Sequence, residues 1–185
     1  VLAAVGGVIY IGSQSKFIPY VVQVDKFGEA VAVSRADIAS PADPRVIHAS
    51  VATFITDLRM VTPDIALQRR AIFRAYAMLS PNDPATTKTN VWLNGTEDSS
   101  PFKRAATETV SIEIISVIPQ TPETWQVDWN ETTYDRQGHI AVTPFKMRAL
   151  LTIYSVGSTA NTTEEQIRNN PLGIYINDYS WSKQV

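Results

Sequence analysis

The chain has 185 residues, of which 44% are hydrophobic and 18% are charged, so it is long enough for one domain with its own core. Its formal net charge of −2 at pH 7 excludes the global positive field that holds nucleic-acid phosphates, and we expect no direct binding to DNA. It contains no cysteine, which excludes disulfides, thiolate metal sites and cysteine nucleophiles.

The first twelve residues form an uncharged, apolar run that turns polar at Ser13. A helix that spans a bilayer needs about 20 residues. We therefore interpret residues 1–14 as the C-terminal part of a longer transmembrane helix, which the small residues Gly6 and Gly7 and the interfacial Tyr10 favour. Two alternatives remain: the hydrophobic region of a signal peptide, which lacks its basic segment and cleavage site here, and an ordinary buried helix or strand.

A short β-hairpin is predicted next, with strands at residues 18–25 and 30–33 around a turn at 26–29. A first helix is predicted from Arg45, because apolar residues follow at the i, i+4, i+7, i+8 and i+11 positions of one helical face. This stripe consists of Ile47, Val51, Phe54, Ile55 and Leu58.

A second helix is predicted to begin at Thr62 and Pro63, with Thr62 as its N-cap. We expect its large apolar side chains to face the core and its polar side chains to face solvent. The predicted inward residues are Ile65, Ile72, Phe73, Tyr76 and Leu79, and the outward ones are Gln68, Arg69, Arg70 and Arg74. Residues 85–93 predict a third, shorter helix, and a loop is expected from there to Pro101.

Beyond residue 105 the apolar period changes from 3.6 to 2, which predicts strands. We expect strands starting near Val110, Trp125, Ile140 and Gly173, with a short capped helix at 162–168 before the last one. Helices followed by antiparallel strands are typical of the α+β class.

Candidates for catalysis are few. His48 and His139 are the two histidines, and no zinc-binding spacing, P-loop, dinucleotide motif or nucleophile elbow is present. We therefore expect no catalytic residue, no metal and no cofactor. The alternative is that an aspartate acts as a general base with His48 in a pocket. The candidate carboxylates are Asp25, Asp57, Asp128 and Asp178, which are scattered along the chain.

Three arginines of the predicted second helix form a basic cluster, in which Arg70 and Arg74 share a helix face. A solvated helix surface is the simplest interpretation. A contact with an acidic protein or with a phosphate is the alternative.

The sequence Asn-Asn-Pro-Leu-Gly at residues 169–173 leads directly into the last predicted strand. Pro171 restricts Asn170 to extended conformations, and Gly173 permits a positive φ, so a stiff turn is expected. Such a turn can hold Leu172 outward as a point of contact. Alternatively, it only sets the register of the strand that follows.

This motif resembles the N-P-x-G signature of the TrbF/VirB-type inner-membrane assembly proteins of type IV secretion systems. Pro-Tyr-Val-Val-Gln-Val-Asp at 19–25 and Ser-Trp-Ser at 180–182 resemble the conjugative TrbF branch, and the order of elements agrees along essentially the whole chain. The resemblance implies a cone-shaped fold like that of nuclear transport factor two, with a curved antiparallel sheet packed on N-terminal helices.

The resemblance also implies a function: a non-enzymatic scaffold of a conjugative DNA-transfer channel. Such a protein is a homo-oligomer in the bacterial inner membrane, crosses it once, and binds other secretion subunits through a periplasmic domain, here residues 15–185. The protein-binding role of the motif carries over to Asn170, Pro171, Leu172 and Gly173. Two alternatives are a cone-fold domain with an Asp/His pocket for a small ligand or a reaction, and a secreted adhesin or pilus component.

Overall fold

The computed structural model describes residues 20–24, 30–35, 43–157 and 162–184. They belong to two compact units, Val1–Ile38 and Ala39–Val185. Among the described residues, no helix combines the length and the apolar character needed to cross a bilayer. The predicted membrane segment, residues 1–14, lies outside the described residues, so its assignment stays a prediction.

The first unit contains a two-stranded antiparallel hairpin. Strand β1 (Tyr20–Val24) pairs with β2 (Ala30–Arg35), and a bulge shifts the register between Gln23 and Val24. The two strands confirm the predicted hairpin, whose turn at 26–29 lies outside the described residues.

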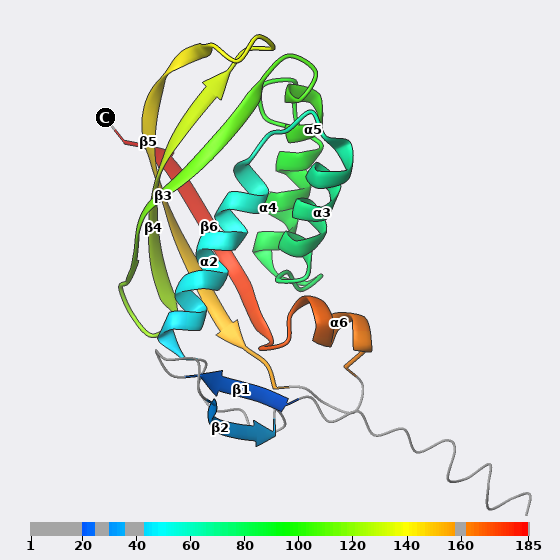
Figure 1. Cartoon of the computed structure of the whole chain (residues 1–185), viewed down its shortest axis with the longest axis vertical. Helices are drawn as coiled ribbons and strands as arrows, with labels where there is room; N and C mark the ends of the chain where they lie inside the picture. Colours follow the sequence, from blue (N-terminus) through cyan, green and yellow to red (C-terminus); the bar gives the residue numbers. More distant parts are fainter. Residues whose placement is uncertain (1–19, 25–29, 36–42, 158–161, 185) are drawn as a thin grey trace, which may run out of the picture. The chain divides into compact units, whose positions relative to one another are not determined.

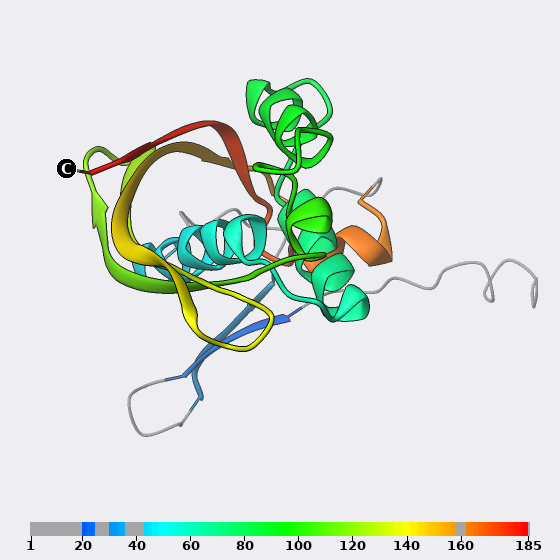
Figure 2. The same cartoon turned by 90° about the horizontal axis from the view of Figure 1, so that it is seen from above.

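The second unit places four helices before an antiparallel sheet of order β3-β4-β5-β6. Seen from above in Figure 2, the strands curl around α2, while α3, α4 and α5 lie outside the curve. Figure 1 shows α2 running along the concave side of the sheet. The elements are α2 (Pro44–Arg59), α3 (Ile65–Tyr76), α4 (Pro84–Leu93), α5 (Pro101–Arg104), β3 (Thr109–Pro119), β4 (Thr124–Tyr134), β5 (Ile140–Ser155), α6 (Glu164–Asn169) and β6 (Ile174–Lys183).

The order of these elements confirms the predicted α+β class. α5 is an additional turn of helix that was not predicted, and it begins at Pro101, where the expected loop ends and the fixed φ of proline suits the first helical position. Helix α2 starts as predicted: the Asp43 side chain caps it by accepting the backbone N–H of Arg45.

The sheet is curved because its ladders are interrupted. The register shifts between Ile114 and Ser116 of β3, around Thr133 of β4, and between Thr152 and Ile153 of β5. Each bulge bends its strand and increases the local twist. The sheet can therefore wrap around α2 and bury it against β3 and β4.

The core lies between the sheet and α2, α3 and α4. The predicted stripe of α2 is buried in full, and the inward positions of β4 alternate as its sequence period requires. The largest fully buried apolar side chains are Trp129, Phe54, Ile55, Leu58, Leu151, Ile174 and Ile176. Each such side chain contributes roughly 1.5–3 kcal/mol by its removal from water.

Helix α3 differs from its prediction in start and orientation. Its N-cap is Asp64, which accepts the Leu67 N–H at 3.0 Å, so the prediction of Thr62 is wrong. Ile72 faces the core as predicted, but Ile65 and Phe73 are 65% and 70% exposed, and Gln68 is buried. The helix buries Gln68, Ala71, Ile72 and Ala75.

Candidate functional site

The turn at residues 170–173 joins α6 to β6. Helix α6, which precedes the turn, is stabilised at its N-terminus by a capping box. The Thr163 hydroxyl accepts the Gln166 N–H at 3.2 Å, and the Gln166 side chain accepts the Thr163 N–H at 2.9 Å. Two of the backbone donors at the start of this short helix are thus satisfied. The predicted capped helix at 162–168 is confirmed.

The Asn170 side chain ties the turn to two other elements. Its Nδ2 donates to the carbonyl oxygens of Ala77, at 3.0 Å, and Ile174, at 2.8 Å, while its Oδ1 accepts the Ile174 N–H at 3.1 Å. Ala77 is the C-cap of α3, and Ile174 is the first residue of β6. One amide therefore fixes the end of α3 against the start of the last strand.

Gly173 is required by both its backbone angle and its surroundings. Its φ is 57°, which side-chain-bearing residues rarely adopt, and an added Cβ would overlap the carbonyl oxygen of Val156. The close approach exists because the Val156 N–H donates to the Gly173 carbonyl at 2.8 Å. The turn is thereby fastened to the end of β5 as well.

The two central residues of the motif are placed differently. Pro171 is exposed, whereas Leu172 is half-buried and packs against the hydrophobic core. Leu172 thus does not stand free as expected, and Pro171 is the residue that the turn displays to solvent. The structure brings all four predicted residues together, and their protein-binding role stays a prediction.

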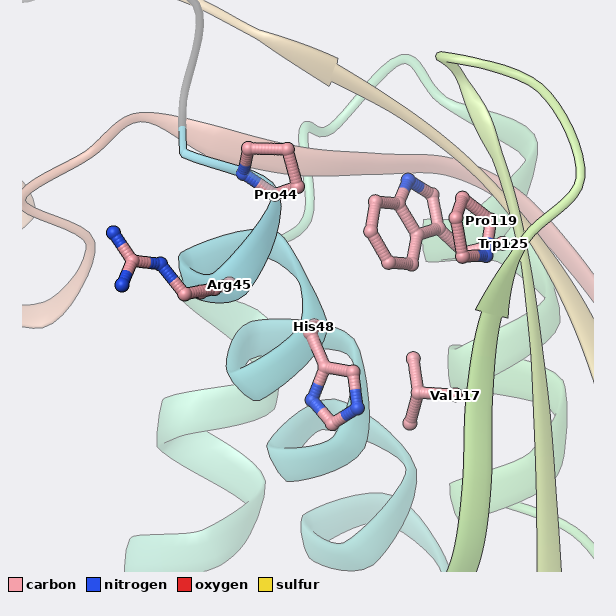
Figure 3. Close-up of a pocket in the computed structure, with 6 residues that line it drawn as sticks. All are labelled: Pro44, Arg45, His48, Val117, Pro119 and Trp125. Carbon is pink, nitrogen blue, oxygen red and sulfur yellow. The ribbon is translucent and has the colours of Figure 1, made fainter.

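His48 lies at a shallow groove, not in a deep polar pocket. Figure 3 shows the groove between the start of α2, the end of β3 and the start of β4. Its volume is about 380 Å³. It is lined by Pro44, Arg45, His48, Val117, Pro119 and Trp125. No carboxylate is among these lining residues, so the groove does not supply the partner that the enzymatic alternative requires for His48.

Three of the four carboxylates that the sequence suggested as catalytic candidates are paired with cations. Asp57 accepts from Arg74 at 2.5 Å, Asp128 from Arg148 at 2.7 Å, and Asp178 from Lys88 at 2.6 Å. Asp25 lies outside the described residues. Across the described ranges, no group of three or more His, Asp or Glu side chains is gathered closely enough to hold a metal ion.

The pKa shifts in this unit follow from pairing and burial. The hydrogen bonds from the Arg148 guanidinium hold the pKa of Asp128 below its usual value. Burial raises the pKa of Tyr179 to about 12, since its phenol lies in the core, and the hydrogen bond with the Thr89 hydroxyl offsets only part of this rise. Both groups therefore keep one charge state at neutral pH, and neither is poised for proton transfer.

A buried ion pair inside the cone was missed by the sequence analysis. Arg59 of α2 donates to Glu131 of β4 at 2.8–3.2 Å, and its guanidinium lies over the rings of Trp92 and Trp181 at 4.6 and 4.9 Å. The sequence did contain a signal for this pair. Glu131 falls on the same side of its strand as Trp125, Val127 and Trp129, and a buried carboxylate there requires a cation as partner.

The second unit therefore presents a surface turn whose backbone is held by hydrogen bonds to neighbouring elements. Similarity along the whole chain shows the protein family to which it belongs. Residues 1–184 match the family model described as VirB8 protein, so the chain belongs to the VirB8 family of type IV secretion components. It is 39% identical over 180 residues to the conjugal transfer protein TrbF of Rhizobium radiobacter, an alignment that covers 97% of this chain and 79% of TrbF.

Solved structures of related secretion proteins share the fold. The soluble domain of TrwG from Bartonella grahamii superposes with a TM-score of 0.66 over 78% of this chain and 96% of its own, at 11% identity. The VirB8 protein of Agrobacterium tumefaciens gives 0.63 over 76% and 92%, at 17% identity. The predicted fold, a domain like nuclear transport factor two with helices before a curved antiparallel sheet, is confirmed.

Proposed function

We propose that this protein is a scaffold of a conjugative DNA-transfer channel, which it helps to assemble by binding other secretion subunits and further copies of itself. Membership of the VirB8 family and the likeness to a conjugal transfer TrbF protein along nearly the whole chain support this proposal. The work of such a protein is positioning, for which a rigid domain with defined surfaces suffices.

The proposed location is the bacterial inner membrane, crossed once, with residues 15–185 in the periplasm. Support comes from the apolar run of the first twelve residues, which suits the end of a membrane helix, and from the family. The net charge of −2 fits a protein that serves DNA transfer without holding the DNA.

The proposed role is not enzymatic. Several described titratable side chains are used in structural ion pairs, such as Asp57 with Arg74 and Asp128 with Arg148. The lining of the groove beside His48 is mainly apolar and contains no acid for it to work with. These observations favour a binding domain over one that performs proton transfer.

The observation that carries the proposal is the construction of the 170–173 turn. Asn170 and Gly173 connect the turn to α3, β5 and β6, so the backbone is fixed before any partner arrives. A preorganised surface loses little conformational entropy on binding. Pro171, exposed at the tip with a half-buried Leu172 beside it, is the proposed contact for another secretion subunit.

The test uses the full-length protein in donor cells that lack their own copy. We expect Pro171→Arg to leave the thermal unfolding temperature within about 2 °C, because Pro171 is exposed and outside the core. We also expect it to reduce both DNA transfer and the recovery of other secretion subunits with the tagged protein by roughly tenfold, since a charge at the centre of a contact is poorly tolerated.

Pro122→Arg is the matched control, because Pro122 is an exposed proline in the turn between β3 and β4. It should change neither measurement. Normal transfer and normal subunit recovery with Pro171→Arg would show that the turn is purely structural. Leu172→Arg is a less clean variant, since Leu172 packs against the core and its replacement is expected to lower stability.

A further inference from the structure

The solvent-exposed side of α3 carries large apolar residues, which are unusual on the outer side of a surface helix. The buried side of the helix is made of Gln68, Ala71, Ile72 and Ala75, while Ile65 and Phe73 stand 65% and 70% exposed. Single exposed apolar residues are ordinary, but a helix that buries a glutamine and exposes a phenylalanine is not. We call the exposed set Ile65, Ala66, Arg69, Arg70 and Phe73 the α3 outer face.

This orientation is fixed by specific bonds, so the exposure is not a loose rotation of the helix. The Gln68 side chain accepts the Thr62 N–H at 2.9 Å and donates to the Met60 carbonyl at 3.2 Å. On the flank, Arg74 is held to the buried Asp57 at 2.5 Å. Turning Phe73 inward would break these contacts and leave buried polar groups without partners.

The α3 outer face also carries two arginines whose guanidinium groups have no partner among the described residues. Arg69 and Arg70 lie one turn before Phe73, at i−4 and i−3, and both are exposed. Within the part of the chain that the structure describes, neither guanidinium group takes part in a hydrogen bond or an ion pair. An exposed aromatic ring next to unpaired guanidinium groups has the composition of interface hot spots.

We infer that the α3 outer face is a docking surface for an acidic, amphipathic segment of another secretion subunit. Carboxylates of the partner would pair with Arg69 and Arg70, while its apolar side chains cover Ile65 and Phe73. The inference rests on the proposed assembly function, but it concerns a surface made by different residues from the 170–173 turn.

The charge of the chain favours a protein partner over an anionic lipid surface. Two free arginines would add only roughly 1 kcal/mol each at an anionic membrane surface, beside the anchoring that the proposed membrane helix already supplies. The net charge of −2 provides no broad positive field that would hold the chain flat against anionic lipid. A short acidic segment needs only the local pair of guanidinium groups, which bind carboxylates with defined geometry.

The experiment places a photo-crosslinking amino acid, p-benzoylphenylalanine, at position 73 of the full-length protein in donor cells. We expect one crosslink to a different secretion subunit, at a segment that contains Asp or Glu. Position 91 is the matched control, because Val91 of α4 is a similarly exposed apolar residue, at 69%. It should give no such crosslink.

Two variants, one single and one double, test how much these side chains contribute to binding. Phe73→Ala should weaken binding roughly 30-fold, as truncation of an aromatic hot spot does, whereas Val91→Ala should have no effect. The charge reversal Arg69→Glu/Arg70→Glu should abolish the crosslink from position 73, and reversing the carboxylates of the crosslinked segment should restore it. Unchanged thermal unfolding of both variants is expected, since all three side chains are exposed.

The possible results distinguish a failure of the proposed α3 docking surface from a failure of the proposed assembly function. A crosslink only to lipid, only to a second copy of this chain, to a segment without carboxylates, or to nothing overturns the inference. Loss of transfer with Pro171→Arg but not with the α3 variants would refute this surface and leave the assembly role standing. Normal transfer without the protein would refute the assembly role itself.

Discussion

Asn170 and Gly173 hold the backbone of one turn in two different ways. Asn170 acts through its side chain, which bonds three backbone groups in two elements. Gly173 acts through the absence of one, because its φ of 57° and the nearby Val156 carbonyl leave no room for a Cβ. Asn170 and Gly173 thus fix the backbone of the turn, while the Pro171 side chain stays exposed and accessible to a partner.

Gly173→Ala should lower the free energy of unfolding by about 3 kcal/mol, the sum of left-handed backbone strain and a displaced Val156 carbonyl. Gly138→Ala is the matched control, because Gly138 also has a positive φ, 85°, but an added Cβ there would meet nothing within 4 Å. It should cost about 1 kcal/mol, the strain alone. Urea unfolding of both variants measures the difference; equal losses would mean that the contact with Val156 contributes nothing.

Helix α3 shows how an element can be oriented against its own hydrophobic pattern. Its apolar residues predicted an inward Ile65 and Phe73, but Gln68 supplies the loop before the helix with a donor and an acceptor that no apolar side chain could provide. Pairing the part-buried Thr62 N–H and Met60 carbonyl with the buried Gln68 side chain outweighs the exposure of two large side chains, since a buried polar group without a partner costs about 1–3 kcal/mol.

Gln68→Leu is therefore expected to destabilise the domain by about 2–4 kcal/mol, even though it makes the buried face of α3 more apolar. Gln166→Leu serves as the control, because its capping bonds to Thr163 are exposed, and it should cost less than about 1 kcal/mol. Thermal or urea unfolding is the measurement. A Gln68→Leu variant as stable as the parent would mean that packing, and not the two hydrogen bonds, orients α3.

The whole second unit is joined at one polar centre inside its core. Arg59 of α2 pairs with Glu131 of β4 and lies over Trp92 of α4 and Trp181 of β6. Glu131 also accepts the Trp129 Nε1–H at 3.3 Å, and Arg104 approaches it to 3.9 Å. Because this centre touches two helices and two strands, it couples the helices to the sheet.

Arg59→Met should cost about 3–5 kcal/mol, since it leaves the Glu131 carboxylate buried without its main cation. The double variant Arg59→Met/Glu131→Gln should be at least about 1 kcal/mol more stable than Arg59→Met, because the stranded charge is gone while the Trp129 acceptor remains. Lys88→Met is the control: its pair with Asp178 is half-exposed, and less than about 1 kcal/mol is expected. A double variant no better than the single would show that the charge of Glu131 is not what destabilises it.

Much of the fold was predictable because the signals are local. The stripe of α2, the alternation along β4 and the capping pattern of α6 each depend on residues within one or two turns, and all three are confirmed. The four residues of the 170–173 turn were also found from the chain itself, because proline and glycine restrict or extend backbone angles wherever they occur.

The amino-acid sequence by itself determined the order of elements, the α+β class, the family resemblance and the position of the stiff turn. Only the tertiary structure decided that α3 turns Phe73 outward, that Leu172 packs inward, and that Arg59 meets Glu131 across 72 positions of the chain. The physical reason is the same in each case. Periodicity reports which residues prefer to leave water, whereas burial is settled by the partners that distant segments bring to each polar group.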